Sequence, residues 1–127
     1  MSDKRVLVVD DNATNLKLIT CLLATEPCEV VTATSAERAL ELMRAARPDL
    51  LLLDLQLPDM DGLELTRILR ADPQLADLPI VAVTAYAMKG DEERAREAGV
   101  DGYVTKPIDK DHFRQVVGTF LRGDARA

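Results

Sequence analysis

The chain has 127 residues, of which 47% are hydrophobic and 30% charged, and its formal net charge is −6. These values are typical of one soluble globular domain with a single core, and they argue against a disordered chain. The acidic balance argues against nucleic-acid binding, which needs a basic face, and no apolar stretch reaches the ~20 residues that a membrane span requires.

Five segments have the composition of β-strands. They cover residues 5–10, 28–33, 49–54, 79–84 and 102–105. The first, third and fourth are continuously apolar, which is typical of strands covered on both faces in a parallel sheet. The second and fifth are shorter or more mixed in composition, so we expect them at the edges of the sheet.

A helical pattern follows each strand. Apolar stripes are formed by Leu16, Ile19 and Leu23 in the first helix, by Ala36, Ala39, Leu40 and Met43 in the second, by Leu65, Ile68 and Leu69 in the third, and by Phe113, Val116, Val117, Phe120 and Leu121 in the last. Ser35, Asp61 and Asp109 are the predicted N-caps of the second, third and last helices. The fourth helix, near residues 88–98, has only alanines for a core face, so we expect it to be the most weakly packed.

Alternating strands and helices predict an α/β fold in which helices cover both sides of a parallel sheet. Ligands bind such folds at the carboxyl ends of the strands. The polar residues expected at that edge are Asp10, Asp11, Asp54, Thr84 and Lys106. Two carboxylates 4 Å apart repel each other by roughly 4 kcal/mol at an effective dielectric constant near 20. A cluster of three is therefore interpreted as a site that usually holds a cation or a proton.

In these motifs the chain closely resembles the receiver domains of bacterial two-component response regulators, of the stand-alone type. The matching segments are residues 6–12 (VLVVDDN), Asp54, residues 57–62 (LPDMDG), residues 84–85 (TA) and Lys106-Pro107. The resemblance implies a doubly wound, five-stranded parallel sheet with strand order 2-1-3-4-5, which is a flavodoxin-like three-layer sandwich. It also implies that residues 1–127 form a single receiver domain, with no output domain in the short segment after the last helix.

The resemblance further implies a phosphoacceptor mechanism. Asp54 would take a phosphoryl group from a histidine kinase or a histidine phosphotransfer protein and become an aspartyl phosphate. Mg²⁺ would be held by the carboxylates of Asp10, Asp11 and Asp54 and by the main-chain carbonyl of Gln56, with Asp10 acting mainly through water. Lys106 would pair with Asp54 and later with a phosphoryl oxygen.

A switch is also implied by the resemblance. Thr84 would move inward to donate to a phosphoryl oxygen, and Tyr103 would rotate into the space behind it. The fourth helix, fifth strand and fifth helix would then bind a downstream protein target. The peptide bond between Lys106 and Pro107 would be cis. Such a protein is not an enzyme in the usual sense, because it catalyses only its own phosphorylation and dephosphorylation.

Several polar residues near these motifs have simpler explanations. Asp59 and Asp61 fit turn and capping roles better than membership of the acidic cluster. Half-buried packing on an edge strand also explains Tyr103. Tyr86 either overhangs the phosphoryl group and blocks attacking water, or contacts partners. His112 is expected to face solvent without a phosphotransfer role.

The start of the chain and its cysteines indicate the compartment. Residues 1–5 lead directly into a strand pattern and do not resemble a secretion signal. Cys21 and Cys28 lack the spacing of a metal site, so we expect both to be reduced thiols. The sequence therefore predicts a cytoplasmic protein.

Three other functions compete with the receiver hypothesis. A haloacid-dehalogenase-like aspartyl-phosphate phosphatase would need a general acid where this chain has Gln56, and the chain is too short for its usual cap domain. A flavodoxin-like flavin carrier would bind phosphate after the first strand, where Asp10 and Asp11 would repel it. A docking module that is never phosphorylated stays an alternative, although Asp54, Thr84 and Lys106 argue against it.

Overall fold

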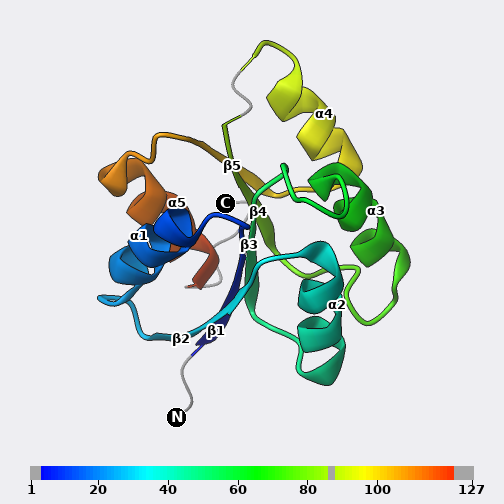
Figure 1. The fold of residues 1–127 in the computed structure, drawn as a ribbon, viewed down its shortest axis with the longest axis horizontal. Coiled ribbons are helices and arrows are strands. Elements are labelled where there is room, and N and C mark those ends of the chain that lie inside the picture. Colours follow the sequence, from blue (N-terminus) through cyan, green and yellow to red (C-terminus); the bar gives the residue numbers. More distant parts are fainter. Residues whose placement is uncertain (1–3, 86–87, 122–127) are drawn as a thin grey trace.

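The computed structural model describes residues 4–85 and 88–121, in which strands and helices alternate. The strands are β1 (Lys4–Val9), β2 (Cys28–Ala33), β3 (Leu50–Leu53), β4 (Ile80–Thr84) and β5 (Gly102–Thr105). The helices are α1 (Ala13–Leu23), α2 (Ala36–Ala45), α3 (Gly62–Ala71), α4 (Asp91–Ala98) and α5 (Lys110–Leu121). Figure 1 shows the sheet in the middle of the molecule, with α1 and α5 on one side and α2, α3 and α4 on the other. The expected three-layer arrangement is confirmed.

The sheet is parallel throughout, and its strand order is β2-β1-β3-β4-β5. The expected order and the expected edge strands, β2 and β5, are therefore confirmed. The order reverses between β1 and β3, because the chain adds β2 on one side of β1 and all later strands on the other. In such folds the crevice for a ligand lies at the carboxyl ends of the two strands where the order reverses.

The central strands are buried on both faces because each face packs against helices. Leu7 of β1 and Leu51 of β3 belong to the core under α2, α3 and α4. Their neighbours Val8 and Leu52 belong to the second core, which includes Phe113 of α5. This two-sided burial explains why the strand segments are continuously apolar.

The three predicted N-caps are confirmed. Ser35 Oγ accepts a hydrogen bond from the amide of Arg38 at 3.2 Å. Asp61 Oδ1 accepts from the amide of Leu63 at 2.8 Å. Asp109 Oδ1 accepts from the amides of residues 111 and 112, at 3.0 Å and 3.3 Å. These caps fix where α2, α3 and α5 begin.

Helix α4 is shorter than the sequence pattern predicts. It begins at Asp91 rather than near residue 88, because the preceding Gly90 has a φ of 93°, which lies outside the helical region. Its buried residues are Ala95 and Ala98, as expected. The small core face of α4 is thus confirmed.

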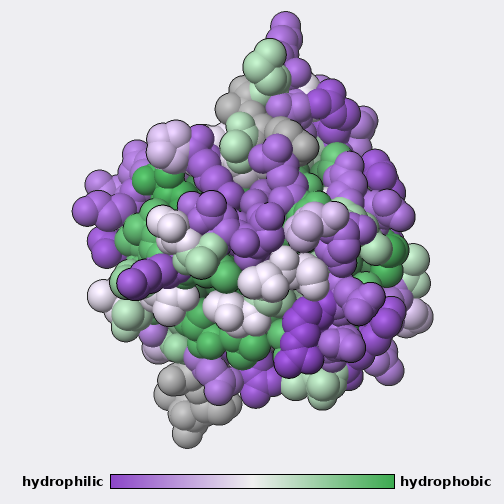
Figure 2. Space-filling model, in the orientation of Figure 1, coloured by the Kyte–Doolittle hydropathy of each residue, from purple (hydrophilic) through white to green (hydrophobic). Residues whose placement is uncertain are grey.

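Among the described residues, the exposed large apolar side chains are those of Leu18 and Met88. Figure 2 shows a face covered mostly by hydrophilic residues, with hydrophobic residues in separate areas. Within the described ranges of the chain, none of the helices combines the length and apolar composition needed to cross a bilayer.

Candidate functional site

Asp10 and Asp54 lie next to each other at the carboxyl edge of the sheet. Asp10 directly follows β1, and Asp54 directly follows β3. The amide of Asp54 donates to the carbonyl of Val9 at 2.9 Å, which joins the two strand ends. Both aspartates are buried, with exposed fractions of 1% and 5%. Buried carboxylates need hydrogen-bond or charge partners, because they have lost their hydration.

Both oxygens of each carboxylate have a partner. The Oδ1 atoms of Asp10 and Asp54 accept from the amides of Asn12 and Gln56, at 2.8 Å and 3.0 Å. These local turns bend the backbone away from the sheet, so β1 and β3 end one residue earlier than the sequence predicts. The two Oδ2 atoms accept from Nζ of Lys106, at 2.9 Å and 3.0 Å. Lys106 therefore makes the expected contact with Asp54 and also contacts Asp10.

Asp11 completes an acidic cluster. Carboxylate oxygens of Asp10, Asp11 and Asp54 lie within 4.8 Å of one another. Asp11 is exposed, so an ion can reach the cluster from solvent. Three carboxylates against one ammonium leave two negative charges, which a divalent cation would balance. Mg²⁺ prefers oxygen ligands of this kind, so the residues present fit it.

Burial raises the pKa of the Asp54 carboxyl, although the amide of Gln56 and the ammonium of Lys106 both oppose this effect. Burial acts to lower the pKa of Lys106, but its hydrogen bonds to Asp10 and Asp54 outweigh burial and raise it. Lys106 is therefore positively charged at neutral pH. Its charge offsets only part of the desolvation of Asp54, and an additional cation would offset more of it.

Thr84 and Lys106 reach this edge from the other half of the sheet. Thr84 is the last residue of β4, it is fully buried, and it pairs in register with Thr105 of β5. The amide of Lys106 donates to the carbonyl of Thr84 at 2.8 Å. The bond between Lys106 and Pro107 is cis. The ends of β1, β3, β4 and β5 thus contribute to one edge.

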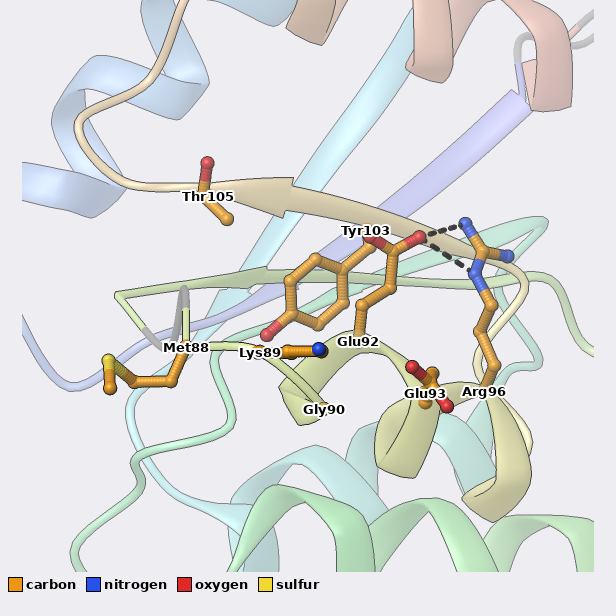
Figure 3. Close-up of a pocket in the computed structure, with 8 residues that line it drawn as sticks. All are labelled: Met88, Lys89, Gly90, Glu92, Glu93, Arg96, Tyr103 and Thr105. Atoms are coloured by element: carbon orange, nitrogen blue, oxygen red, sulfur yellow. Dashed lines mark hydrogen bonds and ion pairs between the residues drawn. The ribbon is translucent and has the colours of Figure 1, made fainter.

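Tyr103 lies outside the acidic cluster, in a pocket of ≈ 460 Å³ between β5 and the start of α4. Met88, Lys89, Glu92 and Arg96 also line this pocket. Figure 3 shows the ring of Tyr103 pointing from β5 toward α4, and the carboxylate of Glu92 paired with the guanidinium of Arg96. Tyr103 is half-buried and packs against the core under α2, α3 and α4.

The sequence also singled out His112 and Tyr86. His112 is exposed, as expected, on the first turn of α5. Tyr86 lies outside the described residues.

Sequence reasoning missed the partner of Asp59. A capping role was expected, but its carboxylate caps a distant helix, accepting from the amides of Ala36 and Glu37 at 3.0 Å and 3.1 Å. These two hydrogen bonds hold the pKa of Asp59 below its ordinary value. No local pattern links positions so far apart in the sequence. The only available signal was that Ser35 can satisfy one of the first amides of α2 but not all of them.

Comparison with known proteins decides the family. Residues 6–118 match the response regulator receiver domain. This chain belongs to the receiver domain family. It is 44% identical to the polar-differentiation response regulators DivK of Brucella anthropi and Brucella ovis, over 122 residues that make up 96% of this chain and 98% of each relative.

Solved receiver structures have the same fold. A putative response regulator from Chloroflexus aurantiacus superposes with a TM-score of 0.90 at 30% identity, covering 95% of this chain and 99% of that one. The receiver domain of the sensor histidine kinase PA1611 from Pseudomonas aeruginosa superposes with a TM-score of 0.85 at 29% identity, with the same coverage. That structure has a magnesium ion coordinated in its active site cleft.

The function follows from family membership. The receiver is a phosphoacceptor signalling protein of a two-component system. Its phosphoryl donors are of the histidine kinase or histidine phosphotransfer class. Nothing in these comparisons favours the phosphatase or the docking module.

Proposed function

We propose that Asp54 is the residue that accepts the phosphoryl group. One of its carboxylate oxygens attacks the phosphorus of a phosphohistidine, so that an O–P bond forms, the P–N bond breaks and the imidazole leaves. The observation that carries this proposal is the convergence of three carboxylates and Lys106 at one edge of the sheet. Asp54 follows β3, the middle strand of the five, and contacts Lys106. Asp10 shares the contact with Lys106, so the choice of Asp54 also rests on the likeness to receiver domains.

The residues that would hold Mg²⁺ are Asp10, Asp11, Asp54 and the main-chain carbonyl of Gln56. When bound, the ion would neutralise charge on the phosphoryl oxygens. The amides of residues 12 and 56 already hold the carboxylates of Asp10 and Asp54 in place. The magnesium ion in the active site cleft of the PA1611 receiver domain supports a magnesium site here.

Lys106 and Thr84 are proposed to stabilise the phosphorylated state. The ammonium of Lys106 would exchange its hydrogen bond with Asp54 for one with a phosphoryl oxygen, while Asp10 keeps it at the site. The hydroxyl of Thr84 would donate to another phosphoryl oxygen. Thr84 ends β4 and Lys106 follows β5, so a movement of either residue on phosphorylation can be transmitted to β5 and α4.

The signal is proposed to leave through the face formed by α4, β5 and α5, with Thr84 and Tyr103 as the switch residues. Support comes from the pocket between β5 and α4, into which the ring of Tyr103 points (Figure 3). The core face of α4 consists of two alanines, so moving this helix disturbs little packing. A downstream protein would bind this face, and the proposed site of action is the cytoplasm.

Intact mass spectrometry after incubation with acetyl phosphate and Mg²⁺ tests the assignment of Asp54. The wild-type chain is expected to gain one phosphoryl group, and Asp54→Asn none, because the amide lacks the nucleophilic carboxylate. Asp77→Asn is a suitable control, since its side chain is 89% exposed and lies in the loop before β4, at the opposite end of the sheet. Phosphoryl uptake by Asp54→Asn would move the acceptor to another residue.

A further inference from the structure

A side chain from another loop completes the N-terminus of α2. A helix leaves its first amides without partners inside the helix. In α2, the amide of Arg38 donates to the N-cap Ser35. The two amides before it, those of Ala36 and Glu37, donate to the two carboxylate oxygens of Asp59. Asp59 lies in the loop between β3 and α3, so the end of one helix is joined to the loop before the next.

This loop also carries the residues of the proposed site. It begins at Asp54, whose Oδ1 accepts from the amide of Gln56. Gln56 in turn pairs with Asp61 through an isolated antiparallel bridge, which closes the loop on itself. Asp59 lies inside the segment closed by this bridge. A displacement of Asp59 therefore acts on the main chain of Gln56 through the segment that this bridge closes.

The start of α2 is connected to the acidic cluster from the other side as well. The amide of Asp10 donates to the carbonyl of Ala33, the last residue of β2, at 3.1 Å. Two residues later Ser35 opens α2. Asp10, the end of β2, the start of α2 and the Asp59 loop thus form a closed ring of contacts around one side of the cluster.

We propose that Asp59 is a positioning residue for the metal site, because it fastens the loop that presents the main-chain carbonyl of Gln56. This inference rests on the proposed role of that carbonyl as a ligand. Hydrogen bonds from helix N-terminal amides to a carboxylate are charge-assisted and are favoured by the helix dipole. Leu57 and Met60 pack against the core, so the loop stays attached without Asp59. Without Asp59, the segment from Gln56 to Asp61 loses its attachment to the start of α2, and the carbonyl of Gln56 is no longer held in one position.

Mg²⁺ titrations followed by thermal unfolding test the proposal. Asp59→Ala is expected to raise the Kd for Mg²⁺ by about 3- to 10-fold. Loss of a residue that hydrogen-bonds a metal ligand directly usually raises the Kd by about 10- to 100-fold, and Asp59 acts on Gln56 only through the loop. Ser35→Ala is the matched control, because it removes a cap from the same helix end without releasing the loop. It should lower the Tm and leave the Kd unchanged. Equal shifts in Kd for both variants, or none for either, would overturn the proposal.

Asp59→Asn separates positioning from simple charge. It removes the negative charge but keeps one acceptor oxygen, so its Kd should lie between those of wild type and Asp59→Ala. The difference between Asp59→Ala and wild type should also persist in about 0.5 M NaCl, where the Debye length is roughly 4 Å. If Asp59→Asn and Asp59→Ala weaken Mg²⁺ binding equally, and the loss disappears at high salt, the effect is due to charge and the positioning role is refuted.

Hydrogen exchange in EDTA supplies a measurement that needs no metal. The amide of Gln56 should exchange faster in Asp59→Ala than in wild type or Ser35→Ala, and an unchanged rate would contradict the proposal. The titration also separates this inference from the proposed function. If wild type itself gains no stability from Mg²⁺, the metal site fails and the inference fails with it. If wild type gains stability and Asp59→Ala gains equally at every concentration, only the inference fails.

Discussion

The ionised carboxylate of Asp54 opposes folding at neutral pH. Burial raises its pKa above the ordinary value of 3.8, so the folded chain holds this proton more tightly than the unfolded chain. Stability from this group is therefore fully present below the ordinary pKa and is lost as the pH rises through the folded pKa. Asp54→Asn removes this loss. In EDTA its Tm should match that of wild type near pH 3 and exceed it at pH 7, by roughly 4 °C for each 1 kcal/mol.

A control variant and a contradicting outcome test this expectation. Asp77→Asn removes an exposed carboxylate and should stay within about 0.5 kcal/mol of wild type at either pH. A Tm of Asp54→Asn below that of wild type at pH 7 would mean that Lys106 contributes more than the desolvation removes. Thermal unfolding followed by circular dichroism at both pH values distinguishes these cases.

Individual site residues were predictable where their place depends only on a strand end. Asp10 and Asp54 follow continuously apolar segments, and a parallel sheet brings such ends to one edge. The second contact of Lys106, with Asp10, was not predictable, because it depends on the register between β4 and β5. The contact of Asp59 with α2 depends in the same way on tertiary placement.

Helix α4 is held at its C-terminal end by one side chain of α3. The guanidinium of Arg70 donates to the carbonyls of Ala76, Leu78 and Gly99 and pairs with the carboxylate of Asp101 at 2.9 Å. Gly99 ends α4 with a φ of 124°, and a Cβ there would lie 2.8 Å from Cγ of Arg70. This anchor leaves the other end of α4, beside Tyr103, as the part that is free to respond.

Arg70→Lys should loosen α4 selectively. Lysine cannot satisfy three carbonyls and a carboxylate at once, so the variant should lose about 1–3 kcal/mol of stability in urea unfolding. Amides of α4 should exchange faster with solvent, while those of β4 stay protected until global unfolding. Arg67→Lys, an exposed position on the same helix, is the control and should behave as wild type. Uniform loss of protection across the sheet would contradict the selective role of Arg70.

The elements themselves were largely predictable from periodicity and caps. Ser35, Asp61 and Asp109 begin their helices as expected, because capping is a local interaction. The start of α4 was not predictable, because Met88 and Lys89 before Gly90 are compatible with a helix and only the positive φ of that glycine excludes it. Local chemistry therefore identifies elements better than it defines their ends.

At the scale of the whole molecule, strand order was the feature that the residue pattern alone could not supply. Alternating strands and helices are equally compatible with several parallel orders, and the order 2-1-3-4-5 came from the family resemblance. Once β1 and β3 are neighbours, the hydrogen bond between Asp54 and Val9 brings the acids together. The fold therefore places three mutually repelling carboxylates at the carboxyl edge of the sheet. The chain as a whole already has a net charge of −6.

A divalent cation should therefore stabilise the entire fold. Binding to the folded chain alone raises stability by about 1.4 kcal/mol for each tenfold excess of Mg²⁺ over its Kd. Asp11→Ala should abolish most of this gain, yet it should not lower the Tm in EDTA, because Asp11 is exposed and its removal relieves repulsion within the cluster. Thermal unfolding in EDTA and in about 10 mM Mg²⁺, with Asp77→Ala as control, measures both effects. A wild-type Tm indifferent to Mg²⁺ would show that Lys106 alone is enough to balance the three carboxylates.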